Sequence, residues 1–151
     1  MMSSRLMLQL LAVVVLFTVS IAAQTTYGAG VTLQEETEFS LLQSQPNTLE
    51  GKAVRVEAAI TSVCTTTPCR WIGISGTRGS TYGQNVFARI EAGKIEFPKS
   101  VVGRRVTIEG VVASVARDPD PEAKVAVAEF NQENPGAPAF WQLKVTGAVL
   151  K

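Results

Sequence analysis

The two cysteines of the chain, Cys64 and Cys69, lie on a short loop between two runs of residues that are typical of β-strands. One interpretation is a structural disulfide that closes this hairpin, as expected in an oxidising compartment. The alternative is a thiolate pair for a soft metal such as Cu(I), or a labile redox couple. Two sulfurs alone make an incomplete metal site, and the chain has no histidine to complete it. We therefore favour the disulfide and expect no bound metal.

The N-terminus has the pattern of an export signal. Arg5 is its one charged residue, an uninterrupted apolar run extends from Leu10 to Phe17, and the small residues Ala22 and Ala23 follow. The apolar run is shorter than the roughly 20 residues that a membrane-spanning helix needs. We expect a signal peptide over residues 1–23, a polar leader over 24–36 and one domain over 37–151. The protein would be periplasmic or secreted, with no stable membrane insertion after cleavage.

The charge balance argues against a nucleic-acid partner. The chain has 14 Lys and Arg residues and 13 Asp and Glu residues, and loss of Arg5 with the signal leaves 13 against 13. A neutral domain lacks the positive field that attracts nucleic acid or an anionic membrane. We therefore expect no nucleic-acid binding.

Ordinary catalysis also has little support in the composition. The absence of histidine excludes Ser-His and Cys-His nucleophile pairs. Two carboxylate pairs, Glu35 with Glu36 and Asp118 with Asp120, lie in polar stretches, so we interpret both as solvated surface charges. The sequence therefore predicts no enzyme, no catalytic residue and no cofactor.

The first long strand shows both its inward face and an irregularity. Val54, Val56, Ala58 and Ile60 alternate with polar residues, as in a strand with one buried face. The next apolar residue is Val63, one position out of phase. This slip predicts a β-bulge near residues 61–63, which would let the strand bend around a small barrel.

Four more strands and a helix follow from similar patterns. The strands are expected over Arg70–Ser75, Asn85–Glu91, Arg104–Val115 and Ala139–Leu150, with Trp141, Leu143, Val145 and Val149 of the last one in the core. Asp120 and Pro121 predict the start of a helix that extends to about Gln132. A short helical turn capped by Thr37 would bury Phe39 and Leu42. The fold class is thus all-β with a minor helix, and the strand pattern suggests a five-stranded OB-like Greek-key barrel.

Several sequence blocks strengthen this view. Gly51-Lys52-Ala-Val54-Arg-Val56, Val63-Cys64 with four residues before Cys69, Phe97-Pro98-Lys99, and Gly103-Arg-Arg-Val106-Thr-Ile108-Glu109-Gly110 occur in this order. They resemble a bacterial family of small exported domains of unknown function with an OB-like barrel. The resemblance covers roughly residues 39–150 and implies the fold and the compartment. In that family a glycine precedes the second cysteine and a tryptophan follows it, whereas here Pro68 takes the place of the glycine and Arg70 separates Cys69 from Trp71.

The candidate binding residues are Trp71, Phe87 and Arg89, together with the neighbouring Arg70. The strand phases place Trp71, Phe87 and Arg89 on the outer face of two adjacent strands. OB barrels commonly bind oligonucleotides or oligosaccharides on this surface, and aromatic rings beside an arginine can stack on a sugar or on a protein. The alternative is that the leader, or the loop from Gly76 to Gly83, covers the two aromatic rings.

Two functional hypotheses follow. The first is an exported, non-enzymatic binding or structural module whose partner is unknown, a glycan or an envelope protein being the kinds that suit a neutral surface. The second is a thiol redox or soft-metal envelope protein that acts through Cys64 and Cys69.

Overall fold

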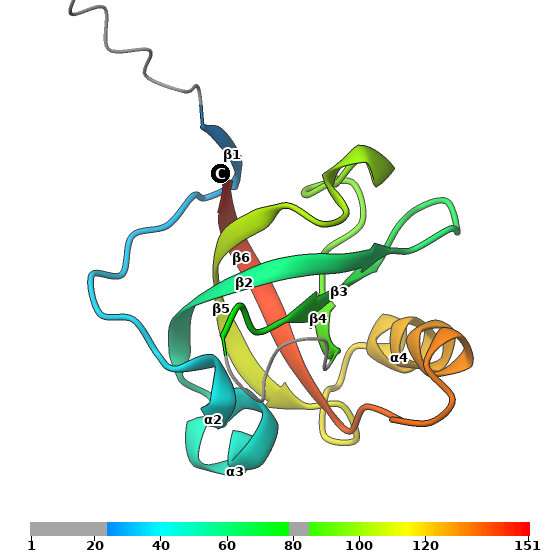
Figure 1. Cartoon of the computed structure of the whole chain (residues 1–151). Coiled ribbons are helices and arrows are strands. Elements are labelled where there is room, and N and C mark those ends of the chain that lie inside the picture. Colours follow the sequence, from blue (N-terminus) through cyan, green and yellow to red (C-terminus); the bar gives the residue numbers. More distant parts are fainter. Residues whose placement is uncertain (1–23, 79–84) are drawn as a thin grey trace, which may run out of the picture.

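A computed structural model describes residues 24–78 and 85–151 of the 151-residue chain (Figure 1). The predicted signal peptide over residues 1–23 and most of the predicted loop from Gly76 to Gly83 lie outside the described residues. Within the described part of the chain, no helix is both long enough and apolar enough to cross a membrane.

Six strands and a few helices make up the fold over the described residues. The strands are β1 (Thr25–Gly28), β2 (Ala53–Val63), β3 (Trp71–Ser75), β4 (Val86–Arg89), β5 (Arg105–Ser114) and β6 (Trp141–Leu150). The helices are α2 (Phe39–Ser44), α3 (Pro46–Leu49) and α4 (Pro121–Glu133), with a 3₁₀ turn η3 (Lys99–Val101) between β4 and β5.

Five of the strands form a closed barrel. The strands follow the order β5-β2-β3-β4-β6, and β6 pairs back with β5 to close the barrel. All neighbours are antiparallel except β4 and β6, which are parallel. The predicted five-stranded OB-like barrel is therefore confirmed. In Figure 1, α4 lies against one side of this barrel, and α2 and α3 lie together at another part of its surface.

The predicted bulge in β2 is also confirmed. Ile60 pairs with Ile74 and Ser62 pairs with Gly73, so Thr61 is the extra residue on β2. Gly73 lies opposite the bulge, where an added Cβ would come within 2.8 Å of the Thr61 hydroxyl. A glycine at this position lets β3 approach the bulged strand closely.

A second bulge, in β6, corrects one part of the predicted core. Glu109 of β5 pairs with Gly147 whereas Gly110 pairs with Val145, so Thr146 is the extra residue. After Thr146 the side chains that point into the barrel are those of Ala148 and Leu150, which are buried. An uninterrupted alternation had predicted Val149 as the buried residue, and this prediction is wrong. Leu143 and Val145 are buried as predicted, while Trp141 is only partly buried at the edge of the core.

The two predicted helices, α2 and α4, lie where the sequence placed them, whereas α3 was not predicted and α2 differs in its cap. Asp120 caps α4, its carboxylate accepting a hydrogen bond of 2.9 Å from the Glu122 amide. Phe39 and Leu42 of α2 are buried as predicted. The N-cap position of α2 is Glu38 and not Thr37 as predicted, and no side chain caps the helix there. The Thr37 amide donates a hydrogen bond to the Arg55 carbonyl of β2.

The polar leader packs on the outside of the closed barrel. Its first residues form β1, which pairs antiparallel with the end of β6. A Cβ on Gly147 would overlap the backbone of Gly30, so the leader lies directly on β6. Further along, the Glu109 carboxylate accepts hydrogen bonds from the backbone amides of Thr32 and Leu33 at 2.7 and 2.9 Å. Partial burial opposes ionisation of Glu109, but these hydrogen bonds outweigh it and lower its pKa.

Candidate functional site

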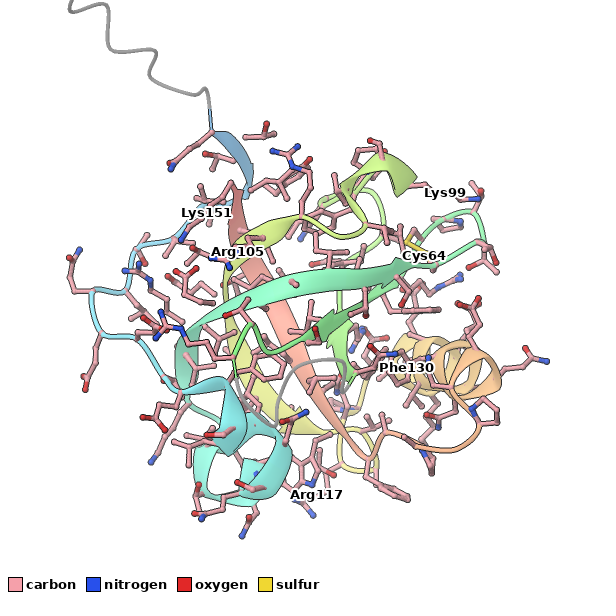
Figure 2. The ribbon with its side chains drawn as sticks, in the orientation of Figure 1. Cys64, Lys99, Arg105, Arg117, Phe130 and Lys151 are labelled. Carbon is pink, nitrogen blue, oxygen red and sulfur yellow. A yellow bond between two sulfur atoms is a disulfide. The ribbon has the colours of Figure 1, made fainter. Side chains whose placement is uncertain are left out.

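The aromatic residues predicted as ligand contacts are buried beneath α4. Trp71 and Phe87 lie on neighbouring strands as predicted, but each is only 1% exposed. Phe130 of α4 packs on both, with ring centroids 5.3 Å from Trp71 and 5.2 Å from Phe87. Figure 2 shows Phe130 on α4 beside the barrel. The two rings are therefore covered, as one of the two interpretations of the sequence had it, and the cover is α4 rather than the leader.

Arg70 also holds the helix rather than facing open solvent. Its guanidinium lies 3.9 Å from the Glu122 carboxylate and 3.7 Å from that of Glu129, both on α4. The Thr66 hydroxyl, on the loop between the cysteines, donates a hydrogen bond of 3.2 Å to Glu129. Arg70 and Thr66 therefore join the cysteine loop to α4.

Arg89 is the centre of a buried polar network. Its guanidinium contacts the Asp118 carboxylate at 3.0 Å and also bonds to Asp120. Asp118 additionally accepts a hydrogen bond of 2.8 Å from the Gln142 amide and lies 3.4 Å from the Lys144 ammonium. The interpretation of Asp118 as a solvated surface charge is wrong, because its side chain is almost fully buried.

The same network sets the ionisation of Asp118. Burial opposes the charged form, but the hydrogen bonds from the Asp120 amide and from Gln142, together with the charge of Lys144, outweigh it and lower the pKa of Asp118. The carboxylate therefore stays ionised as the partner of Arg89. An ionised carboxylate that already accepts hydrogen bonds from Arg89 and Gln142 is typical of a structural ion pair.

Cys64 and Cys69 form the predicted disulfide, with their Cα atoms 5.6 Å apart. It joins the end of β2 to the residues just before β3, as Figure 2 shows at Cys64. Cys64 is buried in the same apolar cluster as Trp71 and Phe130, and Cys69 packs against that cluster. In the described part of the chain, no group of three or more acidic residues or cysteines is placed to hold a metal ion.

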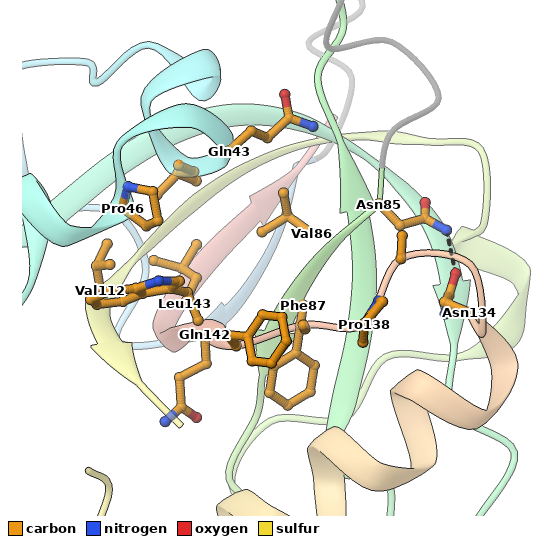
Figure 3. Close-up of a pocket in the computed structure, with 15 residues that line it drawn as sticks. Gln43, Pro46, Asn85, Val86, Phe87, Val112, Asn134, Pro138, Gln142 and Leu143 are labelled. Atoms are coloured by element: carbon orange, nitrogen blue, oxygen red, sulfur yellow. Dashed lines mark hydrogen bonds between the residues drawn. The ribbon is translucent and has the colours of Figure 1, made fainter. Parts of the chain in front are cut away.

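A pocket at one mouth of the barrel is the best remaining candidate for a binding site (Figure 3). It has a volume of about 540 Å³, within the range of ligand pockets, which often lie in barrel mouths. Most of its lining is apolar, and the set comprises Leu42, Gln43, Pro46, Asn85, Val86, Phe87, Val112, Asn134, Ala137, Pro138, Ala139, Phe140, Trp141, Gln142 and Leu143. We call this site the mouth pocket.

The polar groups of the mouth pocket are all uncharged amides. The Asn85 side chain donates a hydrogen bond of 2.7 Å to the Asn134 side chain, which itself donates to the Phe130 carbonyl at 2.9 Å. These bonds join the start of β4 to the segment after α4, as the dashed line in Figure 3 shows. The pocket wall is therefore partly built by the chain that returns from α4 to β6.

Phe140 and Trp141 form the aromatic part of the pocket. Phe140 is 72% exposed, the highest value among the large apolar side chains that the structure describes as exposed. The Arg117 guanidinium lies 5.7 Å from the centre of the Trp141 ring and is also paired with Glu50 at 2.7 Å. The Phe140 ring is thus open to solvent and also part of the lining of the mouth pocket. Phe140 was not among the predicted contact residues. Its position next to Trp141 and shortly after Pro138, at the start of a strand, could have indicated an aromatic contact there.

Comparisons with known proteins assign neither a family nor a ligand to the mouth pocket. A scan against protein-family models finds no match, and a search of the curated proteins finds none either. Among solved structures, the chain is similar to a provisionally assigned aspartyl-tRNA synthetase from Leishmania major Friedlin, with a TM-score of 0.45 and 18% identity. The similarity covers 82% of this chain and 23% of that protein, so the chain spans less than a quarter of its length. The resemblance to the bacterial family of exported domains stays a prediction, and function has to be inferred from the site itself.

Proposed function

We propose that this protein is an exported, non-enzymatic binding module whose ligand occupies the mouth pocket. The pocket carries the proposal, because it combines a ligand-sized volume, an apolar lining and the exposed ring of Phe140. Burial of Trp71, Phe87 and Arg89 supports this location, since the strand surface first considered is filled by α4. The signal-like N-terminus and the disulfide support export.

The ligand is neutral in this proposal. None of the residues that line the mouth pocket carries a charge. A charged ligand would lose its hydration without gaining a counter-charge, which is costly. The balanced charge of the domain gives nucleic acid no attraction either.

A thiol redox or soft-metal function has weaker support. Cys64 and Cys69 are bonded to each other, and Cys64 is buried among aromatic side chains. Thiol exchange and metal capture need an accessible, low-pKa thiol. We therefore assign the pair a structural role in the proposal.

Titration with Nile red, a neutral apolar dye, tests the proposed site. We expect saturable fluorescence enhancement, and about tenfold weaker binding in Phe140→Ser, because burial of an aromatic ring contributes about 1.5 kcal/mol or more. Val125→Ser is the matched control, since Val125 is 47% exposed on α4, away from the pocket lining. The proposal fails if the dye does not saturate, or if Phe140→Ser and Val125→Ser bind it as tightly as the wild type.

A further inference from the structure

The mouth pocket presents ring-bearing side chains to solvent. The Phe140 side chain is 72% exposed, and the neighbouring Trp141 is only partly buried. Pro46 and Pro138 also line the pocket, and Figure 3 shows both of them there. The apolar faces of such rings can pack against the C–H groups of a sugar ring, while the rest of the sugar stays in water. The apolar part of the pocket therefore suits a ligand that has one apolar face.

The amide pair of Asn85 and Asn134 adds hydrogen-bonding groups to the same lining. Asn85 is exposed and donates one N–H to Asn134 at 2.7 Å, and Asn134 donates one N–H to the Phe130 carbonyl at 2.9 Å. A primary amide has two N–H donors and an oxygen with two lone pairs. Among the bonds of the described residues, this leaves one N–H on each amide and the Asn85 oxygen for a ligand. The bond between the two side chains holds these groups in place.

This combination of rings and amides favours a sugar over other neutral ligands. A hydrocarbon that fills the pocket would cover the Asn85 and Asn134 amides without bonding to them, which costs free energy. A peptide that adds as a strand needs open main-chain groups. Phe87 and Gln142 are only 1% and 2% exposed and are already paired with β3 and β5. A sugar carries C–H faces and also hydroxyl groups that both donate and accept, so it matches the rings and the amides together.

We propose that the mouth pocket binds a neutral oligosaccharide. One sugar ring packs on Phe140, and its hydroxyl groups bond to the remaining donors and acceptor of Asn85 and Asn134. The volume of about 540 Å³ lies in the range of sites for drug-sized ligands, and a short oligosaccharide is of that size. This inference rests on the proposed function and narrows its neutral ligand to a glycan.

A panel of neutral and charged oligosaccharides tests the inference on the full mature chain. The neutral probes are maltohexaose, cellohexaose and chitohexaose, which differ in linkage and in ring substituents. Hexagalacturonic acid, with a carboxylate on each ring, is their charged counterpart. We expect calorimetric titration to show a Kd of about 1 mM or tighter for at least one neutral probe. The acid should bind at least about tenfold more weakly, because the pocket lining offers no counter-charge.

Substitution of Asn85 separates sugar binding from apolar binding. Leucine has about the size of asparagine but no donor or acceptor, so Asn85→Leu should bind the neutral probe about tenfold more weakly through the loss of about two hydrogen bonds. Its Nile red binding should not weaken. Gln132→Leu, at an exposed amide of α4 outside the pocket lining, is the matched control and should bind the sugar as the wild type does. In the wild type, the side-chain amide resonances of Asn85 and Asn134 should shift when the sugar binds.

The outcomes separate this inference from the proposed function. No binding of any neutral probe at about 10 mM, beyond the weak end of specific recognition, overturns the inference. Binding that leaves the Asn85 and Asn134 amide resonances unmoved overturns it as well. In both cases, saturable Nile red binding that depends on Phe140 leaves the proposed function standing. Binding of hexagalacturonic acid as tight as that of the neutral probes would make the ligand an anion and overturn the inference. If Asn85→Leu also loses the dye, the wild-type amide shifts decide the question.

Discussion

Arg89 joins the barrel to the segment that leads into α4. Its side chain is buried on the outer face of β4 and contacts two carboxylates, those of Asp118 and Asp120, from the connection after β5. Gln142 and Lys144 of β6 contact Asp118 from the other side. One buried ion pair therefore links β4, β6 and the start of α4. Removal of one partner of such a pair leaves a buried charge uncompensated, which is strongly destabilising.

Arg89→Met should lower the free energy of unfolding by about 3 kcal/mol, the low end for a broken buried pair, because Gln142 and Lys144 still contact Asp118. Arg89→Lys should lose less, since the ammonium keeps the charge but cannot contact both carboxylates as the guanidinium does. Urea unfolding followed by circular dichroism measures both changes. Arg105→Gln, at an exposed arginine on β5, is the control and should stay within about 0.5 kcal/mol of wild type. A loss in Arg89→Met no larger than the control's would contradict a stabilising role.

The sequence predicted where Arg89 points but not what it contacts. Alternation along the strand places Arg89 on the outer face and its neighbours Ala88 and Ile90 on the inner face. Both neighbours are buried in the barrel core as predicted. Its partners lie about 30 residues later, in a stretch whose composition is that of an exposed loop. Burial of Asp118 comes from the path of the chain into α4, and local composition carries no information about that path.

At the scale of elements, α4 decides which surface of the barrel is open. It lies between β5 and β6 in the chain and covers the outer face of β3 and β4 through Ala123, Ala126 and Phe130. OB barrels commonly bind ligands on this face. In this protein the helix occupies it, and the segment that returns from the helix to β6 forms the wall of the mouth pocket instead.

Phe130→Ala should loosen this cover. The expected loss in the free energy of unfolding is about 3 kcal/mol, because a large buried ring is removed from between Trp71 and Phe87. In a Trp141→Phe background, the emission of Trp71 should shift to the red as water reaches its ring. Val125→Ala on the outer face of α4 is the control for helix substitution and should change neither property. An unshifted emission maximum in Phe130→Ala would show that α4 still covers Trp71 without the Phe130 ring.

The position of α4 was predictable, but its contacts were not. Asp120 and Pro121 mark the N-terminus of the helix, and the observed cap confirms this. The buried face consists mainly of alanines with one phenylalanine, a pattern that does not specify which part of the barrel it covers. The β2 bulge was visible because apolar residues flank it, whereas the β6 bulge at Thr146 was hidden by Gly147, which has no side chain to show its phase.

At the scale of the whole molecule, two carboxylates of the barrel bind the leader and Lys151. Glu109 holds the leader through Thr32 and Leu33, and Glu57 accepts bonds from Thr107 at 2.7 Å and from the C-terminal Lys151 at 2.8 Å. Partial burial opposes ionisation of Glu57, but its bonds to Lys151 and Thr107 outweigh it and lower its pKa. With Asp118 and Asp120, four carboxyl groups are thus more acidic in the folded chain than in ordinary peptides.

These lowered pKa values set the direction of the pH dependence. The unfolded chain, with carboxyl pKa values of about 4, binds protons at higher pH than the folded chain does. Stability from these four carboxyl groups is therefore present above about pH 4.5 and is lost as the pH falls through their lower folded values. The chain has no histidine, so no side chain with an ordinary pKa changes charge between about pH 5 and 8.

We expect a melting temperature that is flat from about pH 7 to 5.5 and falls steadily below about pH 4.5, measured by circular dichroism. Glu109→Gln should melt lower than the wild type at pH 7, because the amide binds the backbone of Thr32 and Leu33 more weakly than the carboxylate does. It should lose less on acidification, because one of the four carboxylates is absent. Glu35→Gln, at an exposed leader position, should follow the wild-type curve. A decline that begins between pH 7 and 6, or no decline by pH 3, would contradict control of the acid stability by these four carboxylates, because unfolded carboxyl groups take up protons only near pH 4.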